Sequence, residues 1–137
     1  LKQSAGSDII FDFDKSLSLD GDSGPYLQYS LVRARSVLEK AGGESGVADM
    51  SALQRLPDLA RLIARFPGIV KKAQTLRAPH VVAQYLTQLA SEWNSFYANE
   101  RIIGRDDEAA KLALVRTFAQ TMENGLWLLG IPAPVKM

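Results

Sequence analysis

The sequence contains no cysteine and a single histidine, and these two absences remove most of the usual catalytic and metal-binding arrangements. Without cysteine, the chain has no disulfide framework, no thiolate zinc site and no cysteine nucleophile, and its composition fits a reducing compartment. His80 alone excludes a histidine-based metal cluster, and any Ser-His-Asp arrangement would have to use it. Because His80 follows Pro79 at an expected helix start, a structural hydrogen bond is the favoured interpretation.

The chain also lacks long apolar runs and glycine-rich phosphate-binding loops. No run approaches the roughly 20 apolar residues that a membrane span needs. The opening residues 1–4 are neither an initiator methionine nor a secretory leader, so we expect a piece of a longer protein. A carboxylate metal site is conceivable near the start of the chain, but the aspartate spacing does not match the calcium-binding loop, and an acidic turn is favoured. The aspartates concerned are Asp12, Asp14, Asp20 and Asp22.

What remains is an ordinary globular composition with an uneven charge. The 137 residues are 47% hydrophobic and 23% charged, which fits one domain with a substantial core. Residues 1–22 hold five Asp and two Lys, whereas residues 23–137 hold fourteen Lys or Arg and ten Asp or Glu. Residues 55–77 carry six of these cations against Asp58 alone. Such a cluster attracts phosphate, although a solvated helix face is the simpler alternative.

Hydrophobic spacing predicts a helical chain after a short non-helical start. Residues 8–14 alternate well enough for a short strand or extended arm, and residues 20–25 form a dense turn signal. A first helix follows from Pro25 to the Gly42-Gly43 pair, with one apolar stripe. The stripe consists of Leu27, Leu31, Ala34 and Leu38.

Prolines and glycines divide the rest of the chain into further helices. We expect one helix over residues 51–63, in which Pro57 sets a bend or a fresh start, and a short basic helix over residues 67–76. The next opens at Pro79 and stops at Gly104, and the last extends from a cap at Asp106-Asp107 to Gly130. The expected fold is all-α, a bundle of about five helices with a short extended N-terminal arm.

The first expected helix carries the clearest indication of function. At 100° per residue, Tyr26, Tyr29 and Arg33 fall within about 60° of one another, and the apolar stripe points roughly 100° away. Aromatic rings beside an arginine suit stacked bases and phosphate in single-stranded RNA. The alternative is that both tyrosines pack on a neighbouring helix with their hydroxyls satisfied at the rim.

Four ordered blocks of sequence resemble one family. Gly21-Asp22-Ser23-Gly24-Pro25-Tyr26-Leu27-Gln28-Tyr29, continuing to Arg33, is similar to the signature that joins the catalytic and anticodon-binding domains of arginyl-tRNA synthetases. The stretch Ser51–Leu56, the block His80–Tyr97 and the ending Arg116–Met137 resemble successive parts of the same family. These blocks cover nearly the whole chain, and the Gly-Pro-Tyr-Leu-Gln-Tyr run is specific to this synthetase.

The resemblance implies an RNA-binding role without catalysis. Residues 1–20 would be the remnant of the catalytic and linker region, and residues 21–137 a DALR-type anticodon-binding domain. Its partners would be the anticodon stem-loop of arginine tRNA and the catalytic domain of the full-length chain. That full enzyme is an arginine-tRNA ligase that uses ATP with magnesium. The fragment lacks the ATP-binding signatures, so we expect it to be inactive, without a cofactor of its own, monomeric, cytoplasmic and free of membrane contact.

The resemblance also implies a set of contact residues. Tyr97 and Met137 would lie against the anticodon loop, while the loop of residues 20–24 and the paired tyrosines would shape that region. The candidate tRNA-binding residues are Tyr26, Tyr29, Arg33, Tyr97, Arg101 and Met137. Where many relatives carry Ala-His, this chain has Ser30-Leu31, so any role of that histidine is absent. The competing hypothesis is a helical interaction or structural domain that does not bind RNA.

Overall fold

The computed structural model describes residues 3, 12, 14, 23–42, 49, 51 and 57–137, and the helices lie in its two long ranges. These helices are α2 (Gly24–Lys40), α3 (Asp58–Ala64), α4 (Phe66–Leu76), α5 (His80–Asn99) and α6 (Glu108–Leu128). The described residues contain no strand, which confirms the prediction of an all-α bundle of about five helices. The expected arm over residues 8–14, apart from Asp12 and Asp14, and residues 52–56 lie outside the described residues.

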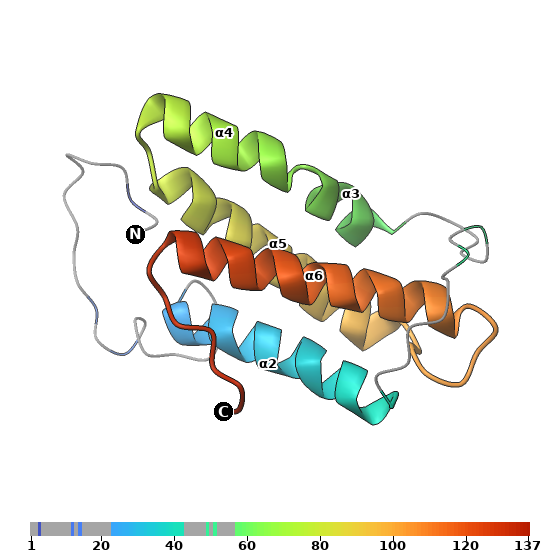
Figure 1. Ribbon diagram of the computed structural model, residues 1–137. Coiled ribbons are helices and arrows are strands. Elements are labelled where there is room, and N and C mark those ends of the chain that lie inside the picture. Colours follow the sequence, from blue (N-terminus) through green and yellow to red (C-terminus); the bar gives the residue numbers. More distant parts are fainter. Residues whose placement is uncertain are drawn as a thin grey trace.

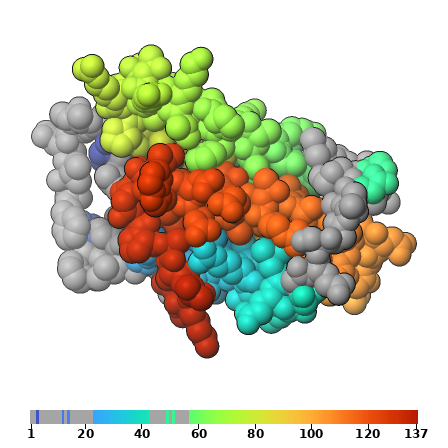
Figure 2. Space-filling view, viewed as in Figure 1, coloured from blue at the N-terminus to red at the C-terminus, as the bar shows by residue number. Residues whose placement is uncertain are grey.

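The two longest helices, α5 and α6, run side by side through the middle of the molecule (Figure 1). Helix α2 packs against both of them on one side, and α3 and α4 pack on the other. The space-filling view shows α6 flanked by α2 on one edge and by α3 and α4 on the other (Figure 2). The α2 side chains therefore face the C-terminal half of α5 across one seam of the bundle.

Local sequence explains where most of these helices begin. Ser23 caps α2 by accepting a hydrogen bond from the Tyr26 backbone N–H at 3.1 Å, and a proline follows in the first turn. Pro57 starts α3 afresh, and Pro79 immediately precedes α5, as the proline positions predict. Because a proline lacks an N–H and has a fixed φ, the first turn of a helix is the place that tolerates it.

One expected helix limit and one expected cap differ from the structure. Helix α5 ends at Asn99 rather than at Gly104, because Glu100 adopts an extended backbone with φ −110° and ψ 128°. Gly104 instead occupies a turn with φ +85°, a conformation that favours glycine. Asp107 stands at the start of α6 as expected, but its carboxylate makes no capping hydrogen bond and contacts Lys111.

The core is centred on the contact between α5 and α6. Trp93 and Phe118 stack with ring centroids 4.8 Å apart, and both side chains are fully buried. Gly125 on α6 faces Leu86 on α5 so closely that a β-carbon there would overlap the leucine side chain. A residue without a side chain is therefore what lets these two helices approach at this point. Other fully buried core residues are Leu31, Leu59, Leu89, Val115, Met122 and Leu126.

We expect Gly125→Ala to lower the free energy of unfolding by about 1–3 kcal/mol, because the added methyl must displace the buried Leu86. Gly68→Ala is the matched control, since a β-carbon at Gly68 meets nothing within 4 Å and the residue is an exposed helical position. Urea unfolding of both variants measures the difference. A Gly125→Ala protein as stable as Gly68→Ala would contradict the close approach.

Tyr85 joins α5 to the α3–α4 layer. Its hydroxyl donates a hydrogen bond to the Leu62 carbonyl at 3.0 Å, and its ring stacks on Phe66 with centroids 5.7 Å apart. Burial raises the pKa of Tyr85 to about 12, because the phenolate form would lose its hydration. The protonated form is therefore the one that the folded protein stabilises.

A raised pKa of Tyr85 makes stability depend on alkaline pH. The folded state keeps the proton to higher pH than the unfolded state, so this stabilisation is complete below about pH 10. It is lost as pH rises towards about 12, and it amounts to about 2–3 kcal/mol. We expect Tyr85→Phe to flatten the fall of unfolding free energy in that window, measured by urea unfolding at a series of pH values. Parallel curves for the two proteins would contradict this assignment.

Candidate nucleic-acid interface

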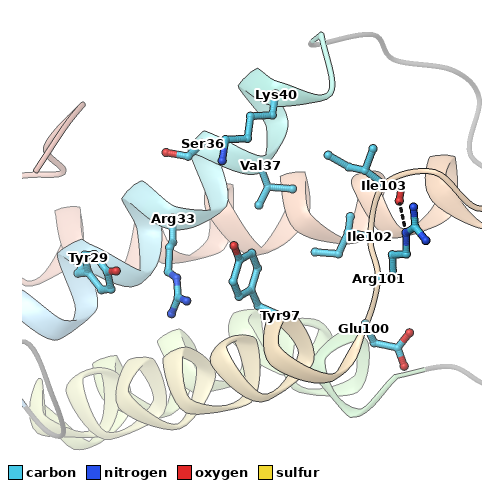
Figure 3. A pocket seen from close by; sticks show the side chains of 10 residues that line it. All are labelled: Tyr29, Arg33, Ser36, Val37, Lys40, Tyr97, Glu100, Arg101, Ile102 and Ile103. Atoms are coloured by element: carbon cyan, nitrogen blue, oxygen red, sulfur yellow. Dashed lines mark hydrogen bonds between the residues drawn. The ribbon is translucent and has the colours of Figure 1, made fainter.

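A groove with a volume of about 620 Å³ lies between α2, the C-terminal end of α5 and the segment that follows α5 (Figure 3). Its charged and aromatic lining comes from sequence segments far apart in the chain. These residues are Tyr29, Arg33, Lys40, Tyr97, Glu100 and Arg101. The groove thus brings together four of the six predicted site residues, namely Tyr29, Arg33, Tyr97 and Arg101.

Arg33 lies between the two tyrosines of the groove. Its guanidinium carbon is 4.4 Å from the ring centroid of Tyr97 and 5.5 Å from that of Tyr29. Both distances fall within the range of a cation–π interaction. Its Nη1 also donates a hydrogen bond to the Asn94 side-chain oxygen at 3.3 Å. Arg33 therefore has a defined position at the groove, with positive charge and aromatic surface side by side.

Tyr97 is anchored from behind by the core. Its ring centroid lies 5.7 Å from that of the buried Trp93, so the aromatic cluster of the core continues to the groove. Tyr97 is half-buried, whereas Tyr29 is 37% exposed. An aromatic ring held in this way offers a stacking surface that loses little side-chain freedom when a base binds.

Tyr26 lies in a different environment from the other two tyrosines. Its hydroxyl accepts a hydrogen bond from the Asn94 amide nitrogen at 2.9 Å, and the same nitrogen reaches the Ser30 hydroxyl at 3.2 Å. Tyr26 packs against the core and does not line the groove. The position of Tyr26 matches the alternative prediction, in which a tyrosine packs on a neighbouring helix and its hydroxyl is hydrogen-bonded at the rim. Ser30 and Leu31, which replace the Ala-His pair, are both fully buried.

Met137 lies on the C-terminal tail, and it is not among the residues that line the groove. The tail follows α2 because Gln28 Nε2 donates to the Pro132 carbonyl and Arg35 Nη1 to the Pro134 carbonyl, each at 2.8 Å. At 100° per residue, Arg35 points about 200° away from Arg33. The tail therefore runs along a different face of α2 from the groove, and Met137 is 57% exposed there.

Three residues at or behind the interface carry little signal in the sequence. Asn94 joins Tyr26, Ser30 and Arg33 only because α5 packs on α2. Lys40 reaches the groove from the last turn of α2, and Lys111 reaches the segment behind it from α6. The spacing of any single helix does not reveal a residue whose role depends on a second helix. An asparagine in an otherwise apolar helix face is the one indication that Asn94 provides.

Most of the described basic residues of the 55–77 cluster lie on α4 or directly beside its two ends, and none of them lines the groove. Their side chains are exposed, and they are Arg65, Lys71, Lys72 and Arg77. Arg61 is paired with Asp58, and Arg55 lies outside the described residues. His80, the single histidine, is the first residue of α5 and is half-buried.

Two further site types were considered for the described part of the chain. No three His, Cys, Asp or Glu side chains in it are grouped where they could hold a metal ion. Asp12 and Asp14 of the acidic start are exposed, whereas Asp20 and Asp22 lie outside the described residues. None of the described helices combines the length and apolarity needed to cross a membrane.

Comparison with known proteins connects this geometry to one family. Residues 27–137 match the family described as DALR anticodon binding domain. The chain is 41% identical over 144 residues to an arginine–tRNA ligase of Ligilactobacillus salivarius, covering 100% of this chain and 25% of that protein. It is 40% identical over 134 residues to one of Ignicoccus hospitalis, covering 94% of this chain and 21% of that protein.

The fold comparison agrees with the sequence comparison. The structure of Thermus thermophilus arginyl-tRNA synthetase superposes with a TM-score of 0.89 and 39% identity, covering 100% of this chain and 25% of that one. The chain thus spans about a quarter of the length of the relatives that it matches. With its five described helices and the match over residues 27–137, the chain belongs to the DALR anticodon-binding domain family.

Proposed function

We propose that this chain recognises the anticodon stem-loop of arginine tRNA on behalf of an arginine–tRNA ligase. The observation that carries the proposal is the position of Arg33 between Tyr29 and Tyr97 at the groove. Single-stranded RNA loops are read by aromatic rings and guanidinium planes that stack on splayed bases, and this arrangement offers both. The similarity to arginine–tRNA ligases over the whole chain supports arginine tRNA as the particular partner.

The residues of the groove would bind RNA both by stacking on bases and by their positive charge. The rings of Tyr29 and Tyr97 would each stack on a base, with each stack contributing about 1–3 kcal/mol. Arg33, Lys40 and Arg101 line the same groove and would hold the phosphates that connect these bases. Tyr26 would act indirectly, because its hydrogen bond with Asn94 joins α2 to α5 beneath Arg33. Met137 would touch an anticodon base only if the RNA also reaches the tail face of α2.

The exposed face of α4 would provide a second, sequence-independent contact. No Asp or Glu occurs between Asp58 and Glu92, while Arg65, Lys71, Lys72 and Arg77 are all exposed in that interval. Four exposed cations in an interval of sequence without acids would attract the phosphates of an RNA stem and strengthen binding at low salt. The bases in the groove would then supply specificity, and α4 would supply affinity.

The rest of the proposal concerns the parent enzyme. The ligase would join arginine to its tRNA with ATP and magnesium in a catalytic domain, to which residues 1–20 would connect the anticodon-binding domain of residues 21–137. The proposal also includes a monomeric state and a cytoplasmic location. A helical domain with no RNA role is the competing function, and it predicts that Tyr97→Ala lowers the melting temperature and leaves RNA affinity unchanged.

Tyr29→Ala tests the groove most cleanly, because Tyr29 is more exposed than Tyr97. We expect its affinity for the arginine anticodon stem-loop to fall by about 5- to 150-fold, the equivalent of one lost stack. We expect Tyr97→Ala to lose at least as much and to be less stable, whereas Tyr97→Phe keeps the ring and most of the affinity. Fluorescence titration of a labelled stem-loop measures each value.

An unrelated anticodon stem-loop is the control for specificity in that titration. Equal affinity for both RNAs would overturn recognition of the arginine anticodon. Unchanged affinity in Tyr29→Ala and Tyr97→Ala would overturn the groove as the RNA site.

Lys72→Gln tests the α4 surface through salt dependence. We expect the magnitude of the slope of log affinity against log salt to fall by about one, with equal weakening for both stem-loops, because a phosphate contact is independent of sequence. Gln74→Ala, on the same exposed helix but without a change of charge, is the matched control. Identical slopes for the two variants would exclude α4 from the RNA contact.

A further inference from the structure

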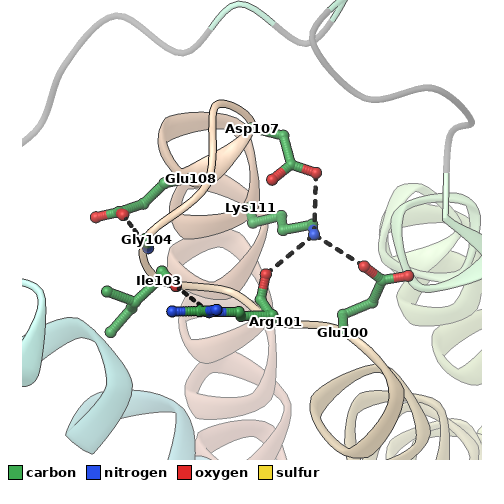
Figure 4. Close-up of polar contacts among 7 residues, drawn as sticks. All are labelled: Glu100, Arg101, Ile103, Gly104, Asp107, Glu108 and Lys111. Atoms are coloured by element: carbon green, nitrogen blue, oxygen red, sulfur yellow. Dashed lines mark hydrogen bonds and ion pairs between the residues drawn. The ribbon is translucent and has the colours of Figure 1, made fainter.

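Lys111 is a buried lysine in a position that the proposed RNA contacts do not explain. It lies on α6 with 4% of its surface exposed, and its Nζ contacts three oxygens around the segment between α5 and α6 (Figure 4). The Nζ is 2.8 Å from Glu100 Oε2 and 2.9 Å from Asp107 Oδ2, and it donates a hydrogen bond to the Arg101 carbonyl at 3.1 Å. A lysine is almost never buried unless it is paired in this way.

The segment that Lys111 holds is also one wall of the groove. Glu100, Arg101, Ile102 and Ile103 all line it, opposite Arg33 and Lys40 of α2 (Figure 3). Among the described residues that line the groove, Glu100 is the only carboxylate. It is about half exposed, with a side-chain relative exposure of 46%. The single acid of the groove therefore has Lys111 as its counterion.

The environment of Lys111 keeps it charged. Burial by itself would lower the pKa of Lys111, but the hydrogen bonds to Glu100 and Asp107 and the charges of these two groups outweigh burial, and the pKa is raised. Lys111 thus carries its positive charge at neutral pH, the condition in which RNA binds. Because Lys111 also pairs with Asp107, its single positive charge offsets part of the combined charge of the two carboxylates.

Ile102 of the wall is buried in the core cluster and attaches the wall by apolar packing, whereas the other polar contacts lie within the wall or at the start of α6. Arg101 Nε donates to the Ile103 carbonyl at 3.3 Å, within the segment itself. The Gly104 N–H donates to the Glu108 carboxylate at the exposed start of α6. Lys111, by contrast, is a buried residue one turn further into α6, next to core residues such as Leu112. Lys111 adds polar contacts that join the Glu100 side chain and the Arg101 carbonyl to the packed part of the bundle.

We propose that Lys111 is a positioning residue of the RNA site, which partly offsets the charge of Glu100 and holds the Arg101 backbone in the groove wall. This inference rests on the proposed function, since it assigns a role within the same groove. Like charges brought together oppose association, so an uncompensated carboxylate at the groove would repel an incoming phosphate. With Lys111 in place, the carboxylate of Glu100 opposes the charges of Arg33, Lys40 and Arg101 less strongly.

A purely structural role of Lys111 predicts a different result from a positioning role. If Lys111 only stabilises the fold, its loss lowers the melting temperature, and the further neutralisation of Glu100 does not restore RNA binding. If Lys111 offsets the charge of Glu100, removing both charges together restores most of the RNA affinity. The two roles therefore separate in a double-mutant cycle, which isolates the coupling between the two residues.

The experiment is a titration of the labelled arginine anticodon stem-loop with Lys111→Met, Glu100→Gln and the double variant. We expect Lys111→Met to bind on the order of tenfold more weakly at low salt and the double variant to recover most of that loss. We expect Glu100→Gln to bind about two- to threefold more tightly, because the change removes the only carboxylate among the described residues that line the groove. Asp107→Asn is the matched control, since Asp107 also pairs with Lys111 but does not line the groove, and we expect no such tightening.

A folded Lys111→Met protein with unchanged affinity would overturn the inference, as would a double variant as weak as Lys111→Met. If Lys111→Met does not fold, Glu100→Gln provides the test. Unchanged or weaker RNA binding by Glu100→Gln would then overturn the proposed offset of its charge. Tyr29→Ala in the same titration tests the proposed function separately. If Tyr29→Ala weakens binding while the Lys111 and Glu100 variants change nothing, the inference alone fails.

If Tyr29→Ala leaves RNA affinity unchanged, the groove is not the RNA site. Amide hydrogen exchange without RNA then tests whether Lys111 attaches the wall. We expect Lys111→Met to speed exchange over residues 101–107, and unchanged exchange would overturn the attachment as well.

Discussion

Trp93 of α5 stacks on Phe118 of α6 with ring centroids 4.8 Å apart, and Gly125 lets the same two helices meet closely at Leu86. This contact determines where the functional elements lie, because every other described helix packs against α5, α6 or both. Tyr97 reaches the surface one turn beyond Trp93 and rests against it. A change in the spacing of the two helices would therefore move the aromatic surface of the groove as well as the core.

Polar contacts add to the apolar packing in fixing how the helices lie against one another. Asn94, one residue after Trp93, contacts Tyr26, Ser30 and Arg33 on α2 through its two side-chain atoms. Such a network favours one register between α2 and α5, because a shift would leave partly buried donors without acceptors. At the far end of the groove, Lys111 does the equivalent for the segment after α5. The groove is thus held at both ends by hydrogen bonds to neighbouring helices.

Much of the architecture is predictable because the signals for it are local. Ser23 and the prolines at positions 25, 57 and 79 mark helix starts, and the apolar period of α2 identifies Leu27, Leu31 and Ala34 as core. The end of α5 is less predictable, since no glycine marks it: the Glu100 backbone is extended, and its carboxylate contacts Lys111 of α6. A helix limit that depends on a residue in another helix has no signature in its own segment.

The sequence by itself determined the helical class, most helix starts and the presence of tyrosines and arginine on one side of the first helix, because these follow from residues within a turn or two of each other. Only the tertiary structure decided which of these residues meet. It placed Tyr29 and Arg33 beside Tyr97, turned Tyr26 towards Asn94 and led the tail with Met137 along another face of α2. The physical reason is that helix packing selects which side chains become neighbours, and it depends on the shapes of two surfaces at once.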